Sequence, residues 1–300
     1  MKIFIDSIDK SKYPGGWYKF HCFLQQALVE SSQDCVASAR DADFIISHLL
    51  NDKIQTMFDP SKLIILDWTD SSSFASFPCL IYFKKSWSQN VLINGVFVKF
   101  NPNNVLSHCR PLQEMALPCY FRPCSEIIEK KELVCVLRNT GKGDSPNRCA
   151  VLNILKNMNI SKANIGALHI NKFGKEWFGG QPKKHLDYLD FISTAKIIVT
   201  CGPSSWEGDS RLWESLASGA CVVTDRIYAD MGHNPIEGKH CFYYDIDRLD
   251  RLCDLLNGLF QDSDLCKRVG DAGRMLALNH HSPAQRLHQI IYEARNVSEN

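Results

Sequence analysis

The sequence predicts an α/β protein built from two doubly wound, Rossmann-like domains that face a cleft. Short apolar runs, each long enough for a buried strand, alternate along the chain with segments of helical spacing. Most of these runs are apolar throughout, which is typical of parallel strands covered by helices on both faces. A length of 300 residues also suits two domains better than one.

The first half alternates less cleanly than the second. It opens on the apolar run KIFID, followed by a turn and by helical spacing over 17–30. An Asn-Gly pair at the centre of VLINGVFVKF predicts a hairpin over 91–100. The other strands are expected at 41–49, 61–68 and 78–87.

The second half predicts a regular succession of strands and helices. Strands are expected at 132–139, 163–170, 196–201, 220–225 and 239–245. Helices are expected at 148–158, 188–195, 211–218, 249–260, 264–278 and from Pro283 onward.

A change in composition near residues 118–131 marks the expected domain boundary. Two prolines and a run of charged residues interrupt the apolar segments there. We therefore expect a first domain over 1–122 and a second over 123–282. We expect the C-terminal helix, 283–300, to pack back on the first domain.

The composition excludes several classes of protein. The net charge is +1 and basic residues form no long run, so we expect no nucleic-acid partner. The apolar start of the chain is interrupted at Asp6, unlike a signal peptide, and no stretch has the length of a membrane helix. We therefore expect a cytoplasmic protein without an integral membrane segment. The 13 cysteines contain no C-x-x-C pair, which favours reduced core residues over zinc ligands.

The stretch CGPSSWEGDSRLWESLASGACVVTD, residues 201–225, joins two of the predicted strands. Ligands of doubly wound sheets bind at such strand exits, beyond the carboxyl ends of the strands. Ser210 is the expected N-cap of the intervening helix and Gly219 its terminator. We expect Leu212, Leu216 and Ala217 to form its buried stripe.

Two charged residues of this helix, Arg211 and Glu214, lie side by side at three-residue spacing. The helix N-terminus and Arg211 suit a pyrophosphate, and the two oxygens of Glu214 suit the hydroxyls of a ribose. The alternative is an exposed ion pair that contributes about 0.3–0.5 kcal/mol to stability.

The same stretch resembles the nucleotide-sugar loop of GT-B glycosyltransferases. Glu214 matches the second glutamate of their Glu-x7-Glu motif, which holds the donor ribose. Glu207 matches the first, but only six residues separate the two glutamates here. The form SRLWESLASGACVV is closer to exostosin-like transferases, and the resemblance covers about residues 130–245.

The resemblance implies a glycosyltransferase that uses a nucleotide-diphosphate sugar, with a UDP-sugar favoured. The acceptor would be a hydroxyl of a glycan or glycoprotein, and the reaction would be inverting, with no bound metal and no permanent cofactor. The basic loop LRNTGKGDSPNR would contribute to binding the donor phosphates. The alternative is that its charged side chains are simply exposed to solvent. The expected donor-binding residues are Arg138, Lys142, Arg148, Ser205, Gly208, Asp209, Ser210, Arg211 and Glu214.

Two other functions compete with this interpretation. One is a catalytically degenerate protein that binds nucleotide sugars without turnover. The other is a different α/β enzyme with a phosphorylated cofactor, such as a dehydrogenase. The absence of a G-x-G-x-x-G motif counts against the second.

An inverting transferase needs a general base for the acceptor hydroxyl. The candidates follow predicted strands of the first domain: we rank Asp70 first, Asp67 second and Asp6 third, with His48 as a further alternative. Each of the carboxylates is also typical of turns and caps. Three further polar residues are expected to be exposed to solvent rather than to contact a ligand: Lys84, Lys85 and His233.

Overall fold

The computed structural model of the chain describes residues 1–7, 16–49, 57–68, 78–85, 90–93, 96–99, 108–112, 115–116, 131–139, 146–161, 163–169, 192–202, 208, 210–228 and 232–299. The chain divides into two compact units. The first comprises Met1–Glu114, Tyr228–Met231 and Pro283–Asn300, and the second comprises Met115–Ile227 and Gly232–Ser282.

The first unit contains a six-stranded parallel sheet in the order β2-β1-β3-β4-β5-β8. The strands are β1 (Lys2–Ile5), β2 (Asp34–Cys35), β3 (Phe44–His48), β4 (Leu63–Asp67), β5 (Ile81–Lys84) and β8 (Cys109–Pro111). The predicted hairpin is confirmed, because β6 (Asn90–Ile93) pairs antiparallel with β7 (Val96–Lys99).

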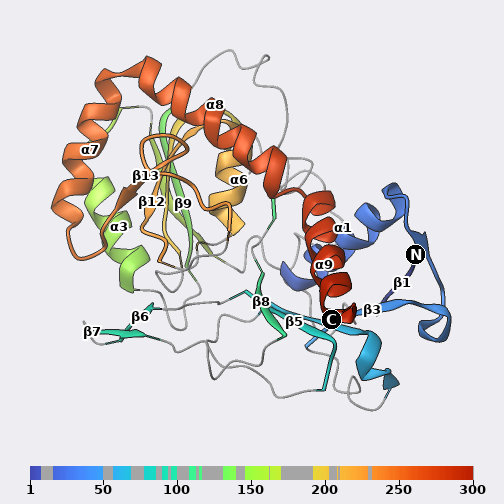
Figure 1. Cartoon of the computed structure of the whole chain (residues 1–300). Coiled ribbons are helices and arrows are strands. Elements are labelled where there is room, and N and C mark those ends of the chain that lie inside the picture. The colour runs from blue at the N-terminus through green and yellow to red at the C-terminus, as the bar shows by residue number, and fades with distance from the viewer. Residues whose placement is uncertain are drawn as a thin grey trace. The chain divides into compact units, whose positions relative to one another are not determined.

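Helices α1 (Gly16–Glu30) and α9 (Pro283–Ser298) contact each other within this unit (Figure 1). Helix α1 buries Phe20, Leu24 and Leu28, which share one face at four-residue spacing. Helix α9 buries Leu287, Ile290 and Ala294 in the same way. Two single-turn helices, η1 (Ala39–Asp41) and η2 (Pro60–Lys62), precede β3 and β4.

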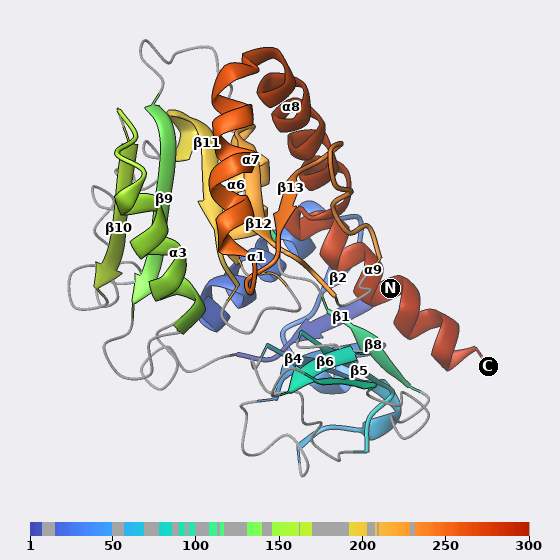
Figure 2. The same ribbon diagram turned by 90° about the vertical axis from the view of Figure 1, so that its left-hand side faces the viewer.

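The second unit contains a five-stranded parallel sheet in the order β10-β9-β11-β12-β13 (Figure 2). The strands are β9 (Lys131–Asn139), β10 (Ala163–His169), β11 (Ala195–Thr200), β12 (Cys221–Asp225) and β13 (Phe242–Tyr244). The helices are α3 (Pro146–Asn157), α6 (Ser210–Ser218), α7 (Leu249–Gln261) and α8 (Ser263–His280).

Both faces of the second sheet are covered. Leucines of α3 and α7 join inward side chains of β9, β11 and β12 in one core cluster. Helix α6 lies on the other side of the sheet, where α8 packs against it (Figure 1). This two-sided cover confirms the expected doubly wound architecture and explains why the strands are apolar throughout.

Two strands of the first sheet, β2 and β8, were not predicted from the sequence. Both are very short, and Asp34–Cys35 is exposed, so neither shows the apolar pattern of a buried strand. The helix expected over 188–195 falls largely outside the described residues. No helix in the described part of the chain is both long and apolar enough to span a bilayer.

Each sheet reverses its strand order at one point. In the first unit β1 lies between β2 and β3, and in the second β9 lies between β10 and β11. Connections therefore diverge to opposite faces at the β1/β3 and β9/β11 positions, and ligands of open α/β sheets bind beyond the carboxyl ends of the strands at such positions. These two edges are where the fold places a functional site.

Candidate functional site

The carboxyl edge of the second sheet is tied together by polar contacts to the backbone. Arg148, in the first turn of α3, donates from Nε to the carbonyl of Cys201 at 3.0 Å, directly beyond β11. Asp225, at the end of β12, accepts from the backbone N–H of Gly202 at 2.7 Å. Tyr244 donates its hydroxyl to the carbonyl of Thr200 at 2.9 Å. The start of the predicted ligand loop is thus held from three directions.

Helix α6 follows that loop and begins at Ser210, which is its first helical residue and not its cap. Gly208 has φ +71°, and a Cβ there would lie 2.9 Å from a methyl group of Leu212. Only glycine meets both conditions without strain. Gly219 ends the helix with φ +81°, as predicted.

The expected buried stripe of α6 is confirmed, but the buried part of the helix is wider than the stripe. Besides Leu212, Leu216 and Ala217, the polar residues Glu214, Ser215 and Ser218 are buried. Glu214 is only 3% exposed, so the exposed ion pair with Arg211 is excluded as an explanation for this carboxylate. Burying a carboxylate is costly unless it is paired or hydrogen-bonded, so a buried glutamate needs polar neighbours.

Helix α8 and the residue after it fix α6 from behind. The indole of Trp213 stacks on the imidazole of His281, with ring centroids 3.9 Å apart. Arg274 donates from Nη1 to the carbonyl of Ala217 at 2.9 Å, near the C-terminus of α6, where a cation is favourable. The position of Glu214 and Arg211 is therefore set by a packed framework.

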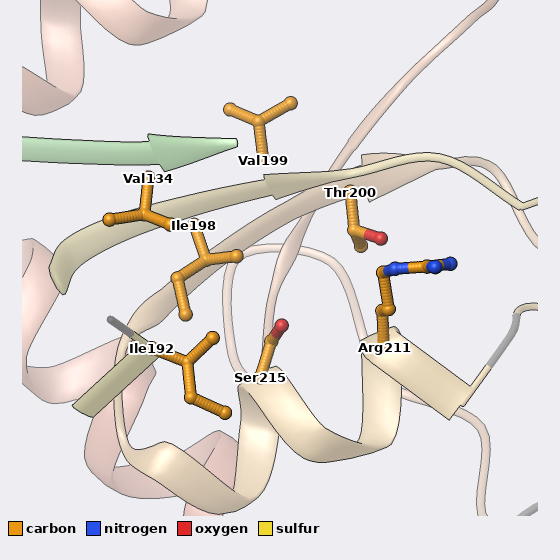
Figure 3. A pocket seen from close by; sticks show the side chains of 7 residues that line it. All are labelled: Val134, Ile192, Ile198, Val199, Thr200, Arg211 and Ser215. Atoms are coloured by element: carbon orange, nitrogen blue, oxygen red, sulfur yellow. The ribbon is translucent and has the colours of Figure 1, made fainter. Parts of the chain in front are cut away.

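A small cavity of about 10 Å³ lies between α6 and the sheet. Its polar lining consists of Thr200, Arg211 and Ser215, and its apolar lining comes from strands β9 and β11 and from Ile192 (Figure 3). Thr200 is 2% exposed, and its hydroxyl finds no hydrogen-bond partner among the described residues.

The predicted donor-binding residues are brought together only in part. Arg148, Gly208, Ser210, Arg211 and Glu214 lie at the carboxyl edge of the second sheet or on α6 beside it. Arg138 lies in β9, although only its backbone is described. Lys142, Ser205 and Asp209 lie outside the described residues, as does Glu207.

The loop after β12 contains His233, which is exposed as expected. It adopts φ +50°, and its ring stacks on His280 with centroids 3.9 Å apart. Burial and the neighbouring His233 lower the pKa of His280. This stacking ties the loop to the C-terminal end of α8.

In the first unit, Asp6 and His48 lie at the β1/β3 switch point. Asp6 is 8% exposed and accepts from the hydroxyl of Ser47 at 2.7 Å. The Trp68 indole donates to Nδ1 of His48 at 3.2 Å, so the neutral ring carries its proton on Nε2. Burial, and to a smaller extent His21, lower the pKa of His48 to about 3.

Asp67 is engaged in a buried ion pair. Its Oδ2 accepts from Lys84 Nζ at 2.8 Å and from the hydroxyl of Tyr82 at 2.6 Å, and neither Asp67 nor Lys84 is exposed. The expectation that Lys84 and Lys85 are solvated is wrong, because both are buried. Asp70 lies outside the described residues.

Sequence reasoning missed His21. This residue lies in α1, is 3% exposed, and contacts the ring of His48 edge-on with centroids 5.4 Å apart. Burial lowers its pKa, while the charge of Asp6 acts in the opposite direction. The signal available in the sequence was its place early in the helix after the first strand, which directs it toward the exit of that strand.

The residues that the structure describes contain no group of three or more histidine, cysteine or acidic side chains arranged to hold a metal ion.

Comparison with solved structures identifies the fold. The chain has the GT-B glycosyltransferase fold, with two Rossmann-like domains. Its structure is similar over 99% of its length to sucrose-phosphate synthase from Thermosynechococcus elongatus, of which it covers 98%, with a TM-score of 0.60 and 9% identity. It is also similar to a glycosyltransferase from Rickettsia africae, with a TM-score of 0.57, 10% identity and coverage of 100% of this chain and 98% of that one.

A third similar structure is Anabaena HepE in complex with UDP-glucose, with a TM-score of 0.56, 9% identity and coverage of 98% and 99% of the two chains. Residues 153–292 match the family model described as glycosyl transferase-like. This range contains α6 and most of the second unit. No curated protein sequence matches the chain. The family match and the fold together support a glycosyltransferase.

Proposed function

We propose that the protein transfers a sugar from a nucleotide-diphosphate sugar, with a UDP-sugar favoured, to a hydroxyl group of a glycan or glycoprotein. The transfer is inverting and needs no bound metal, as the resemblance to exostosin-like GT-B enzymes implies. The complex of the structurally similar HepE with UDP-glucose supports this class of donor.

The burial of Glu214 on α6 is the observation that carries the proposal. Glu214 is 3% exposed and lies on the helix that follows β11, beside the carboxyl edge of a parallel sheet, where ligands of doubly wound folds bind. Two carboxylate oxygens accept hydrogen bonds from the two hydroxyls of a ribose. Glu214 is therefore the proposed ribose ligand.

Arg211 is the proposed diphosphate ligand. It lies in the first turn of α6, where the helix presents backbone N–H groups and a partial positive charge. As the bond between the sugar and the phosphate breaks, negative charge grows on the leaving nucleoside diphosphate. A guanidinium and a helix N-terminus both stabilise that charge. Arg148, anchored to Cys201, supports the same edge.

The acceptor hydroxyl forms the new bond to the anomeric carbon, and its proton passes to a base in the first unit. Of the two proposed carboxylates that the structure describes, we favour Asp6, which directly follows β1 at the switch point and whose charge opposes the lowering of the pKa of His21 by burial. Asp67 is already engaged with Lys84 and Tyr82. We extend the proposal to an Asp6–His21 pair as the proton acceptor.

A thermal-shift screen with UDP, GDP, ADP and dTDP, each with and without a sugar, tests the donor. A ligand present at 100 times its dissociation constant stabilises the protein by about 2.7 kcal/mol. We expect the largest shift with UDP compounds. No shift with any of the compounds would contradict the proposal.

Turnover separates an enzyme from a protein that only binds the donor. Asp6→Asn should leave UDP binding unchanged and lower sugar transfer by about 10²–10⁴, the usual contribution of a general base. A parent protein that binds UDP-sugar tightly but transfers no sugar, to water or to any glycan offered, would favour the degenerate binding protein.

A further inference from the structure

Thr200 is a buried polar residue that the proposed chemistry does not use. It ends β11, its side chain is 2% exposed, and its hydroxyl has no hydrogen-bond partner among the described residues. An unsatisfied buried hydroxyl is unfavourable, and nearly all such groups in folded proteins bond either to protein or to ordered water. The question is therefore what the hydroxyl of Thr200 binds.

The cavity beside Thr200 has the right size and chemistry for one water molecule. Its volume of about 10 Å³ is that of roughly one water-sized sphere. A buried water needs two to four polar partners, and Thr200, Ser215 and Arg211 supply three. Figure 3 shows the hydroxyl of Thr200 turned toward the Arg211 side chain, and the hydroxyl of Ser215 directed toward the strands.

We infer that one ordered water in this cavity links Thr200 and Ser215 to the guanidinium of Arg211. Thr200 is then a positioning residue that restricts Arg211 to one orientation. Arginine loses considerable rotamer freedom when it binds a ligand, and restricting it beforehand reduces that loss. The inference about the water is independent of function, whereas its effect on donor binding rests on the proposed function.

The variant Thr200→Val tests the inference, because valine has almost the same shape and lacks the hydroxyl. If the hydroxyl holds a water, the substitution removes a satisfied hydrogen bond and should lower the melting temperature of the ligand-free protein. If the hydroxyl is merely unsatisfied, its removal should raise the melting temperature. A raised or unchanged melting temperature overturns the inference.

Donor binding gives the second readout. Thr200→Val should weaken UDP binding about two- to tenfold, the effect of losing one hydrogen bond, and Thr200→Ser should restore most of it. The matched control is Thr224→Val: Thr224 pairs with Thr200 in the sheet register, is also buried, and donates to Asp225 at 3.2 Å outside the cavity. A larger loss of UDP affinity in Thr224→Val than in Thr200→Val would overturn the positioning role.

A crystal structure of the parent protein should show one ordered water within hydrogen-bond distance of Thr200 Oγ1, Ser215 Oγ and Arg211. The two proposals can fail separately. If the parent shows this water and Thr200→Val has a lowered melting temperature, but the parent binds no nucleotide, the proposed function fails while the water site stands. Tight UDP binding by the parent with no water in the cavity would mean the reverse.

Discussion

The buried ion pair of Asp67 and Lys84 shows how a single contact changes the role of a residue. A base must be able to accept a proton from a substrate, yet Asp67 Oδ2 already accepts from Lys84 and from Tyr82. The residue that looked second best as a base is thus better explained as part of the first unit's core polar network.

This role predicts an effect on stability. Lys84→Met leaves the carboxylate of Asp67 buried without its cation, and breaking a buried pair in this way costs about 3–5 kcal/mol in the free energy of unfolding. The double variant Lys84→Met/Asp67→Asn should recover most of the loss, since the amide still accepts from Tyr82. Urea unfolding measures both. A cost below about 1 kcal/mol for the single variant would argue against a tight pair.

His48 predicts a pH dependence of stability. Its pKa is lowered to about 3 in the folded protein, so the folded state keeps the ring neutral. Between about pH 6.5 and pH 3 the unfolded state binds a proton that the folded state does not. The free energy of unfolding therefore decreases as the pH is lowered, by up to about 1.4 kcal/mol per pH unit.

His48→Asn isolates this effect, because the amide oxygen can still accept from the Trp68 indole but does not titrate. Unfolding free energies of parent and variant, measured at pH 7.5 and pH 5, should show a smaller loss on acidification in the variant. Equal losses would mean that His48 is not kept neutral by the fold.

At the scale of elements, close packing by helix α8 contributes to the burial of α6. It packs against α6 and β12 because two of its residues are glycines. A Cβ on Gly273 would lie 2.6 Å from the carbonyl oxygen of His240, and one on Gly270 would overlap the carbonyl oxygen of Gly219. The backbone of α8 therefore approaches these loops more closely than any side chain permits.

Two glycine-to-alanine substitutions should consequently change the stability of the protein in opposite directions. Gly270→Ala should destabilise the protein despite the higher helix propensity of alanine, because the clash is with backbone. Gly258→Ala on α7, where a Cβ meets nothing within 4 Å, should stabilise it by about 0.4–1 kcal/mol. Thermal unfolding of the two variants compares them directly. Stabilisation by both would show that the close packing of α8 is not needed.

Local patterns predicted most elements but not their surroundings. The apolar runs located the strands of the second sheet, and Gly219 located the end of α6. The burial of Glu214 could not be predicted from the local pattern, because α6 is packed against α8, which lies far downstream and approaches through its glycines. His21 was missed for a similar reason: only the fold brings it beside Asp6 and His48.

At the scale of the whole molecule, the last helix belongs to the first unit although it follows the second in sequence. Ile290 on α9 is fully buried, and α9 contacts α1. Ile290→Ala should cost about 2–5 kcal/mol in the stability of the first unit. Nucleotide binding by the second unit should persist. Limited proteolysis would measure the opening of the first unit, and UDP titration would measure nucleotide binding. Loss of UDP binding before the first unit unfolds would contradict this separation.

The central claim is that α6 of the second unit binds the nucleotide of the donor. Calorimetric titration of UDP into the parent, Glu214→Gln and Glu237→Gln tests it, the last being a matched control because Glu237 is an exposed carboxylate of the same unit. The amide of Glu214→Gln preserves the shape of the buried side chain but loses its charge. We predict that this variant alone weakens UDP binding, by about 1.5–3 kcal/mol. A folded Glu214→Gln protein that binds UDP as tightly as the parent, or a parent that binds no nucleoside diphosphate, would contradict the account.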